Sequence, residues 1–349
     1  MTDSASYHIV RQYGRTGGME RYVWELTHAL ARQGQQVRIV CEKLHEPVTE
    51  AIEVIELGVI KPKPRWLSML RFSARISEFF KAQNTEGWVI HSHERTAVHH
   101  VTTFHGPPIL SRKKRALDFL SPRLQTWEYL ERRELCSESV ISVLPNSIPV
   151  AEQLSQYYPI ASEKIGAPAY PGVDPLFSKL PRQSDGKTIG FIGKEWQRKG
   201  LDFASLVIAQ LRKQNPEIRF LVAGPAADEV RHLFADWPTA SYELLGWCRA
   251  EEVLPKIDLL IHPARVEPFG MVMAEANAAG IPIVISDHCG IKTLITEDQG
   301  TVLPLKNTSL WGKIIKSRLN QSYNVTPLGL TWGQLAQQHQ QLYRTVLQG

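Results

Sequence analysis

Residues Thr188–Pro225 read T-I-G-F-I-G-K-E-W-Q-R-K-G-L-D-F-A-S-L-V-I-A-Q-L-R-K-Q-N-P-E-I-R-F-L-V-A-G-P. The short apolar runs Thr188–Ile192 and Phe220–Ala223 predict strands, and the amphipathic segment Leu201–Leu211 between them predicts a helix. A strand, a crossover helix and a second strand make up the unit from which parallel sheets are built. The fold class is therefore predicted to be α/β.

The same alternation continues on both sides of this stretch. Before it, strands are predicted at Tyr7–Val10, Val37–Cys41, Val89–His91, Val101–Phe104 and Val140–Val143. After it, strands are predicted at Tyr242–Leu245, Leu259–His262, Pro282–Ile285 and Gly300–Leu303, with a helix from about Gly270 to Ala279. The proline-rich segment Ala167–Gly186 has little periodicity and is the predicted linker. We therefore expect two doubly wound parallel-sheet domains that face a central cleft, with ligands beyond the carboxyl ends of the strands.

Composition excludes several classes of protein. A hydrophobic fraction of 43% and a charged fraction of 21% in 349 residues are typical of a globular chain with a sizeable core, which excludes disorder. No apolar run approaches the roughly 18 residues of a membrane span, and the first residues are polar, so neither a span nor a signal peptide is expected. The four cysteines are far apart, which argues against a zinc site and a disulfide framework and favours the cytoplasm.

Positive charge is concentrated in one part of the chain. From Lys61 to Arg115 there are eleven Lys or Arg against three Glu, a local excess of eight, which favours an anionic partner. Residues 61–81 mix basic and bulky apolar residues at helical spacing, and residues 112–115 read R-K-K-R. Two interpretations stand. The segments could contact an anionic membrane surface, at about 1 kcal/mol per cation, or residues 61–81 could form a domain helix whose apolar face is core.

The window Arg265–Gly280, R-V-E-P-F-G-M-V-M-A-E-A-N-A-A-G, contains two carboxylates eight positions apart. Pro268 favours a bend after Glu267, and the composition from Gly270 onward favours a helix, so Glu267 is predicted in a loop and Glu275 within the helix. The unpaired N–H groups and the dipole at the start of that helix would favour a phosphate. The alternative is one surface glutamate and one ordinary helix glutamate.

This window and four other segments resemble one enzyme family. Glu267-Pro268-Phe269-Gly270 with Glu275 resembles the E-x7-E signature of retaining glycosyltransferases of the GT-B fold, family 4. The other four segments are G-G-M-E-R at Gly17–Arg21, T-F-H-G at Thr103–Gly106, P-G-V-D at Pro171–Asp174 and G-K-E-W-Q-R-K-G at Gly193–Gly200. They occur in the order that the family has. Residues 11–26, R-Q-Y-G-R-T-G-G-M-E-R-Y-V-W-E-L, are similar to the bacterial enzymes that build the lipopolysaccharide core.

The resemblance implies a role for each matching residue. It implies that Arg198 and Lys199 neutralise the leaving diphosphate without a metal, that Glu267 binds a donor-sugar hydroxyl, and that His105 faces the donor sugar, so these four are the expected catalytic residues. The other expected donor-binding residues are Gly17, Gly18, Lys194, Phe269, Gly270, Met271 and Glu275, and the expected nucleobase region is Trp247, Cys248 and Arg249. Glu275 would take the ribose hydroxyls. The structural alternatives are a solvated basic turn at Arg198 and Lys199 and a tight strand-to-helix turn at the two glycines.

The resemblance also implies domain roles and a reaction. Residues 1–168, completed by a C-terminal helix within 329–349, would bind the acceptor, and residues 169–328 would bind the nucleotide sugar. The expected reaction is transfer of a hexose, with retention, from a UDP-sugar to a glycan or glycolipid acceptor such as lipopolysaccharide core, and no cofactor. A soluble acceptor or an exopolysaccharide is the close alternative. A glycolipid acceptor would place the enzyme in the cytoplasm, at the inner face of the plasma membrane.

Three other interpretations are weaker. His91-Ser92-His93 has the form of a metal pair, but the carboxylate and the spacing of an H-x-H-x-D-H site are missing, so no metal is expected. A nucleic-acid binder would explain the basic segments but not the two spaced glutamates, so no nucleic-acid partner is expected. A nicotinamide dehydrogenase would need G-x-G-x-x-G, whereas residues 14–20 read G-R-T-G-G-M-E.

Overall fold

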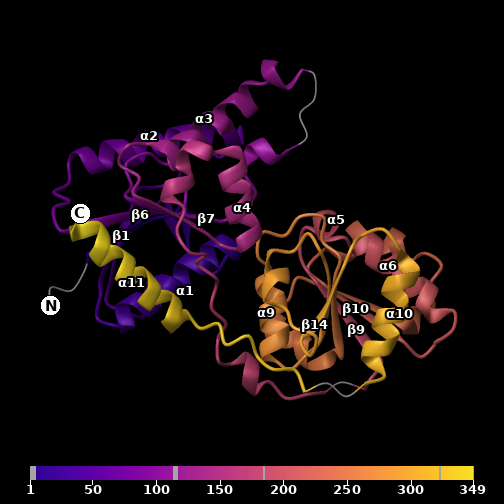
Figure 1. Ribbon diagram of the computed structural model, residues 1–349. Coiled ribbons are helices and arrows are strands. Elements are labelled where there is room, and N and C mark those ends of the chain that lie inside the picture. The colour runs from indigo at the N-terminus through magenta and orange to yellow at the C-terminus, as the bar shows by residue number, and fades with distance from the viewer. Residues whose placement is uncertain (1–4, 113–116, 184, 322–323, 349) are drawn as a thin grey trace. The chain divides into compact units, whose positions relative to one another are not determined.

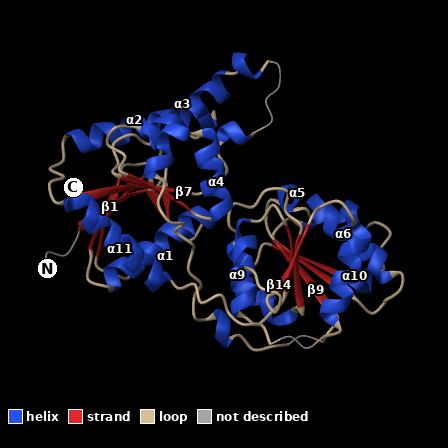
Figure 2. Ribbon diagram, viewed as in Figure 1, coloured by secondary structure: helices blue, strands red, loops and turns tan. Residues whose placement is uncertain are grey.

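Parallel strands form the centre of each half of the chain in the computed structural model, which describes residues 5–112, 117–183, 185–321 and 324–348. Unit 1 comprises the chain up to Gly172 and again from Thr331, and unit 2 comprises Val173–Leu330. The sequence had placed these two divisions after residues 168 and 328. Figures 1 and 2 show a sheet with helices on both of its faces in each unit.

The sheet of unit 1 has the strand order β5-β3-β1-β6-β7-β8, and all of its neighbouring strands are parallel. Its strands are β1 Ala5–Ile9, β3 Gln36–Cys41, β5 Ile52–Glu56, β6 Trp88–Ser92, β7 Val101–Phe104 and β8 Ser142–Pro145. A separate pair is formed by β2 Gln12–Tyr13 and β4 Lys43–Leu44. The order reverses between β1 and β6, and ligands of doubly wound sheets bind at such a point.

The helices of the described residues that cover this sheet are α1 Gly18–Arg32, α2 Arg65–Lys81, α3 Pro122–Cys136, α4 Ile148–Tyr157 and α11 Trp332–Gln348. Helix α11 comes from the end of the chain and packs against α1 and β6 (Figure 1, yellow). Its Tyr343 is fully buried, and the Gln33 side chain donates a hydrogen bond of 3.0 Å to the Gly333 carbonyl. The C-terminal helix is thus part of the core of unit 1.

The sheet of unit 2 repeats the pattern with the order β11-β10-β9-β12-β13-β14, again all parallel. Its strands are β9 Thr188–Ile192, β10 Arg219–Ala223, β11 Tyr242–Gly246, β12 Leu259–His262, β13 Ile283–Ser286 and β14 Gly300–Leu303. The order reverses between β9 and β12. The two parallel sheets confirm the predicted α/β class and the GT-B type of architecture.

The helices of unit 2 are α5 Trp196–Lys199, α6 Leu201–Arg212, α7 Ala227–Val230, α8 Ala250–Val253, α9 Met271–Ala278 and α10 Thr308–Leu319. One side of the sheet forms a continuous core with α6 and α10, in which the side chains of Leu201, Ile208 and Trp311 are fully buried. Short 3-10 segments in the two units are η1 Ile109–Ser111, η2 Asp118–Leu120, η3 Pro159–Lys164, η4 Phe177–Lys179, η5 Arg231–Phe234, η6 Thr239–Ser241, η7 Leu254–Lys256 and η8 Gly290–Leu294.

Helix α2 accounts for most of the basic segment 61–81, and its apolar face is core. Phe72, Ile76 and Phe80 pack with strand residues of unit 1 in one buried cluster. Of the two sequence interpretations, the structure therefore supports the domain helix, because the apolar residues that would enter a membrane are already covered. Of residues 112–115, only Arg112 lies within the described residues, where it forms an ion pair with Asp118. None of the described helices is long and apolar enough to span a bilayer.

Candidate active site

The basic turn that the sequence singled out follows the carboxyl end of β9 and contacts the loop that follows β12. After β9 the chain passes through Gly193, and a Cβ atom there would collide with the Lys199 side chain, so only glycine lets that side chain lie across the turn. Gly200 ends α5 with a φ of +78°, and a Cβ atom there would strike the carbonyl oxygen of Pro263. The two glycines therefore hold Arg198 and Lys199 against the loop that follows β12.

Three positively chargeable side chains surround one carboxylate in this place. Glu267 Oε2 lies 3.2 Å from Lys199 Nζ and 3.5 Å from Arg198 Nη1. It also lies 3.4 Å from Nε2 of His262, the last residue of β12. The Glu267 side chain is 11% exposed and that of Lys199 is 17% exposed, so solvent screens this pair only partly. We call Arg198, Lys199, His262 and Glu267 the unit 2 cluster.

The charges of the unit 2 cluster fix its protonation. Burial alone would raise the pKa of Glu267, but Lys199, the hydrogen bond with His262 and Arg198 together hold the pKa well below its usual range. Burial lowers the pKa of His262, and Lys199 adds to this effect, although Glu267 opposes it. At neutral pH the cluster is therefore an ionised carboxylate between two cations and a neutral imidazole. Arg198 also pairs with Glu195 at 2.6 Å, so Lys199 is the cation closest to Glu267.

The two glutamates of the E-x7-E window occupy the positions predicted for them. Glu267 lies in a loop held by hydrogen bonds from its own N–H to the His288 carbonyl, 3.2 Å, and from the Gly290 N–H to its carbonyl, 2.8 Å. Gly270 takes a φ of +108° and α9 begins at the next residue. Glu275 is inside α9 and buried. The first N–H groups of a helix have no partner in their own helix, so the start of α9 offers donors to a ligand.

The remaining predicted donor residues of unit 2 differ in their surroundings. Lys194 is exposed beside the basic turn, and Phe269 is buried, with its carbonyl accepting from the Ile291 N–H at 3.0 Å. Trp247 is 73% exposed and follows β11, the edge strand, whereas the unit 2 cluster lies at β9 and β12. Cys248 is half-buried, and Arg249 lies 3.8 Å from Glu251.

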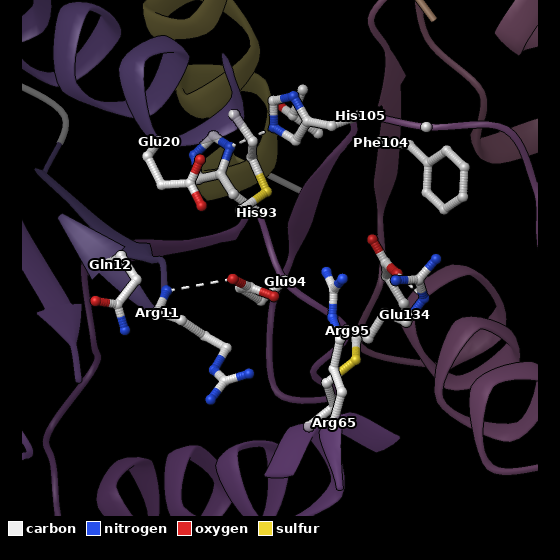
Figure 3. A pocket seen from close by; sticks show the side chains of 14 residues that line it. Arg11, Gln12, Glu20, Arg65, His93, Glu94, Arg95, Phe104, His105 and Glu134 are labelled. Carbon is white, nitrogen blue, oxygen red and sulfur yellow. Dashed lines mark hydrogen bonds and ion pairs between the residues drawn. The ribbon is translucent and has the colours of Figure 1, made fainter. Parts of the chain in front are cut away.

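In unit 1 the predicted residues border a pocket at the point where the strand order reverses. The pocket has a volume of about 310 Å³ and is drawn in Figure 3. It is lined by Arg11, Gln12, Met19, Glu20, Arg65, Met69, His93, Glu94, Arg95, Thr103, Phe104, His105, Gly106 and Glu134. Gly17 is the extended residue before α1, and Gly18 is the first residue of α1. The two glycines thus directly precede Met19 and Glu20, which line the pocket.

His105, the residue expected to face the donor sugar, lines this pocket and is joined to other aromatic side chains. Its Nε2 lies 3.1 Å from His93 Nδ1, and its ring meets that of Tyr22 edge to face at a centroid distance of 4.8 Å. Burial lowers the pKa of His105 to about 3, so the ring is neutral at pH 7. His91, His93 and His99 are fully or almost fully buried, and His100 is half-buried.

The pocket also contains charged residues that sequence analysis did not single out. The Arg11 N–H donates to Glu94 Oε1 at 3.3 Å (Figure 3). The Arg95 guanidinium lies 2.7 Å from Glu131 and 3.9 Å from Glu134. Burial raises the pKa of Glu94 and of Glu134 to about 7, although Arg11 and Arg95 respectively oppose this. These residues come from separate loops and helices, and no local motif marks them.

Sequence analysis also missed His262 in unit 2 and His8 in unit 1, because no local motif marks either residue. His262 follows the apolar run L-L-I and reads as the end of a strand, and only its position at the carboxyl end could have suggested a site. His8 lies in β1 beside β6, where pairing brings it next to His91. Nitrogens of His8, His91 and His93 lie within 4.8 Å of one another, so the pair H-x-H has a third possible ligand that spacing could not reveal.

Two family matches cover both units. Residues 16–175 match the family described as Glycosyltransferase Family 4, and residues 173–327 match the family described as Glycosyl transferases group 1. The chain is a GT-B glycosyltransferase of the group 1/family 4 type. This type of glycosyltransferase uses nucleotide sugars.

Three known proteins illustrate what this glycosyltransferase is similar to. A D-inositol 3-phosphate glycosyltransferase of Jonesia denitrificans is 25% identical to it over 88% of this chain and 84% of its own. WaaG, a glycosyltransferase involved in lipopolysaccharide biosynthesis, has a TM-score of 0.78 at 18% identity, with 98% of both chains covered. The Anabaena protein HepE, in complex with UDP and glucose, has a TM-score of 0.67 at 15% identity, with 99% of this chain and 97% of its own covered. The two structural similarities are similarities of fold.

Proposed function

We propose that the enzyme transfers a hexose from a UDP-sugar to a glycan acceptor, with retention of the anomeric configuration and without a metal. The observation that carries this proposal is the unit 2 cluster at the crevice between β9 and β12. Ligands of doubly wound sheets bind at this place. Two cations there can stabilise the charge that develops on a leaving diphosphate, and a fixed cation needs no reorganisation during the reaction. HepE, which has the same fold, binds UDP and glucose, and this supports UDP as the nucleotide.

The chemistry of the unit 2 cluster is divided between its cations and its carboxylate. Arg198 and Lys199 are the groups that would contact the phosphates, with the N–H groups at the start of α9 as further donors. Glu267 stays ionised and would accept a hydrogen bond from a donor-sugar hydroxyl. Glu275 would bind the ribose. Retention then needs no nucleophile from the enzyme, because the leaving phosphate oxygen can take the proton of the acceptor hydroxyl as the new glycosidic bond forms.

A phosphorylated glycolipid of the lipopolysaccharide-core type is the first candidate for the acceptor. Arg65, at the exposed start of α2, lines the unit 1 pocket, so the basic segment meets the pocket at this residue. An acceptor phosphate bound there would explain the concentration of positive charge in residues 61–81. The fold shared with WaaG is consistent with such an acceptor.

A soluble phosphorylated acceptor is the second candidate. Two observations favour it: the apolar face of α2 is core, and the similar Jonesia enzyme acts on an inositol phosphate. Transfer to a phosphorylated core oligosaccharide in detergent, compared with transfer to inositol 3-phosphate, separates the two candidates. Flotation with anionic vesicles provides a second test, because only a glycolipid acceptor requires contact with a membrane surface.

The proposal predicts that Lys199→Ala and Glu275→Ala each lower kcat by about a hundredfold or more, the usual effect of losing one preorganised group. Lys316→Ala, which removes an exposed lysine of α10, is the matched control and should leave kcat unchanged. Circular dichroism checks that the fold is retained. Wild-type turnover in Lys199→Ala would disprove the role of the unit 2 cluster.

Proton NMR of the first product reports the anomeric configuration, and an inverted product would disprove retention.

A further inference from the structure

A continuous row of hydrogen-bonded side chains crosses the sheet of unit 1 and ends at His105. Gln35 Nε2 lies 2.8 Å from Ser6 Oγ, and Ser6 Oγ lies 3.2 Å from His8 Nε2. His8 Nδ1 lies 3.2 Å from His93 Nε2, and the planes of the two rings are nearly parallel, at 12°. His93 Nδ1 lies 3.1 Å from His105 Nε2. We call these five residues the histidine row.

Burial makes every ring of the histidine row neutral. Ser6 and His8 are fully buried, and His93 is almost so. Burial lowers the pKa of His8 to about 3 and that of His93 well below its usual range. A neutral imidazole has one N–H donor and one acceptor nitrogen. A ring that accepts a hydrogen bond at one nitrogen therefore donates from the other nitrogen to the next ring. The direction at one end of the row therefore fixes the tautomer at the other end.

The glutamine sets that direction. Its amide nitrogen donates to Ser6 Oγ, and its Oε1 is buried without a partner among the described residues. In the opposite amide orientation the oxygen would accept from Ser6 Oγ instead, so the orientation of this one amide sets the direction of the row. Ser6 Oγ accepts from Gln35, so its hydroxyl proton is available for His8 Nε2. His8 Nδ1–H then donates to His93, and His93 Nδ1–H donates to His105 Nε2.

We infer that His8 and His93 are positioning residues, which hold His105 as the tautomer protonated on Nδ1. The free N–H donor of His105 is then at Nδ1, and a donor of this kind suits a sugar hydroxyl oxygen. Tyr22 at the face of the ring and the Asn146 side chain, which donates to the His105 carbonyl at 3.3 Å, hold the residue in place. The inference rests on the proposed function only in its last step, the contact between His105 and the donor sugar.

A metal ion bound by His8, His91 and His93 would require a different arrangement. Each histidine would have to present an unprotonated nitrogen to the ion. Both nitrogens of His91 already have partners, the Tyr343 hydroxyl at 2.5 Å and Thr103 Oγ1 at 2.8 Å. The facing nitrogens of His8 and His93 share one proton between them. The hydrogen-bonded row uses the observed contacts without displacing any of them.

The test is the tautomer of His105 in the full-length protein, measured by NMR with ¹⁵N-labelled histidine rings and assigned through the signal lost in His105→Gln. We expect a protonated Nδ1 and an unprotonated Nε2 at pH 7. A protonated Nε2 would overturn the inference, and so would a stoichiometric metal in the purified protein whose binding is lost in His8→Asn. The tautomer itself is read on the wild type, and His105→Gln serves only to assign the signal, with its fold checked by circular dichroism.

Two variants of His93 connect the tautomer with activity. His93→Phe removes the donor to His105, and we expect His105 to change to the Nε2–H tautomer and kcat/KM to fall by about tenfold, the effect of one lost hydrogen bond. His93→Asn keeps an N–H near the Nδ1 position and should restore the Nδ1–H tautomer and most of kcat/KM. His339→Gln is the matched control, because His339 is equally buried in unit 1 and its ring stacks on that of His91 at 5.4 Å, yet among the described residues its hydrogen bond is to Leu335 of its own helix.

Different results would disprove the histidine row and the contact between His105 and the donor sugar. If His105 has the Nδ1–H tautomer but His105→Ala keeps the wild-type kcat/KM, the histidine row stands and the donor-sugar contact of the proposed function is wrong. If His105→Ala loses activity while the tautomer is Nε2–H, the contact stands and the histidine row is wrong. An unchanged tautomer in His93→Phe would also contradict the inference, since nothing would then connect His93 with the proton of His105.

Discussion

Glu267 and Glu134 are both buried carboxylates, yet their pKa values move in opposite directions. Burial favours the protonated form of both. At Glu267 this effect is outweighed by Lys199 at 3.2 Å and Arg198 at 3.5 Å, and the pKa falls. At Glu134 the single guanidinium of Arg95 is 3.9 Å away and is shared with Glu131, so burial prevails and the pKa rises to about 7. The number and distance of the cations therefore decide which carboxylate is charged.

The raised pKa of Glu134 predicts a pH dependence of stability. An ordinary glutamate in the unfolded chain has a pKa of about 4.3, so the protonated carboxyl stabilises the fold below that pH. This contribution is lost as the pH rises through about 7, the pKa in the folded state. Glu134→Gln keeps an acceptor for Thr102 and has no charge. We therefore compare the unfolding free energy of this variant with that of the wild type at each pH. The variant's advantage should be larger at pH 8 than at pH 4, by roughly 3 kcal/mol.

Urea titrations at the two pH values measure this difference. Glu128→Gln changes an exposed glutamate on the same helix, α3, and should show the same difference from wild type at both pH values. An effect of Glu134→Gln that does not change with pH would mean that Glu134 titrates normally in the folded protein.

At the scale of residues, the sequence predicted what a local pattern can encode. The positions of Glu267 in a loop and Glu275 in a helix followed from Pro268 and the helix-forming residues after it. His262 and His8 could not be found in this way, because each reads as an ordinary strand residue. Their neighbours come from pairing of β12 with β9 and of β1 with β6, which brings together residues far apart in the chain.

At the scale of elements, the turn from α5 to α6 depends on Gly200. An alanine there would take a left-handed φ, at a cost of about 1–2 kcal/mol, and its Cβ would displace the Pro263 carbonyl. We expect Gly200→Ala to lower the unfolding free energy by at least about 2 kcal/mol and to lower kcat, because Pro263 begins the loop that carries Glu267. Urea unfolding and a transfer assay measure both effects.

The matched control for this turn is Gly312→Ala in α10. Gly312 is helical, and a Cβ atom there meets no other atom within 4 Å. This variant should therefore raise the unfolding free energy by about 0.5–1 kcal/mol, the difference in helix propensity between alanine and glycine. Equal stability changes in the two variants would show that the backbone of the Gly200 turn is not constrained.

Element prediction succeeded where burial is strong on one face or on both. The strands Thr188–Ile192 and Leu259–His262 were predicted with the bounds that the structure has, since they are buried on both faces. The edge strand β5, I-E-V-I-E, was missed because alternating glutamates make it read as exposed chain. For α2 the sequence indicated an apolar face but not what covers it. A helix that packs on a protein core and a helix that lies on a membrane have the same spacing of apolar residues.

At the scale of the whole molecule, the last helix completes the first unit. Helix α11 buries Leu335, Ala336, His339 and Tyr343 in unit 1. We expect deletion of residues 331–349 to unfold unit 1 and to leave unit 2 folded, which limited proteolysis with mass spectrometry would detect. Deletion of residues 347–349 alone is the control and should leave the digestion pattern unchanged. Protection of unit 1 in the longer deletion would mean that α11 is dispensable for its core.

The two-unit architecture follows from the sequence because each unit repeats the strand–helix–strand alternation around its own core. The positions of the two divisions differ from the prediction by a few residues: the structure divides the chain after Gly172 and Leu330. Proline content predicts a linker at Ala167–Gly186, whereas the end of a domain depends on contacts. A Cβ atom on Gly172 would collide with the backbone of Trp332, so this residue still packs within unit 1.

In the proposed function, Lys199 and its neighbours in unit 2 bind the diphosphate of a nucleotide sugar without a metal. The most direct measurement is thermal unfolding of the wild type and of Lys199→Ala with UDP, GDP, ADP or CMP, each in the presence of EDTA. We predict that one nucleoside diphosphate, UDP, stabilises the wild type by about 2.7 kcal/mol at 100 times its Kd and leaves Lys199→Ala unchanged. Stabilisation that disappears with EDTA, or that persists in Lys199→Ala, would contradict this account.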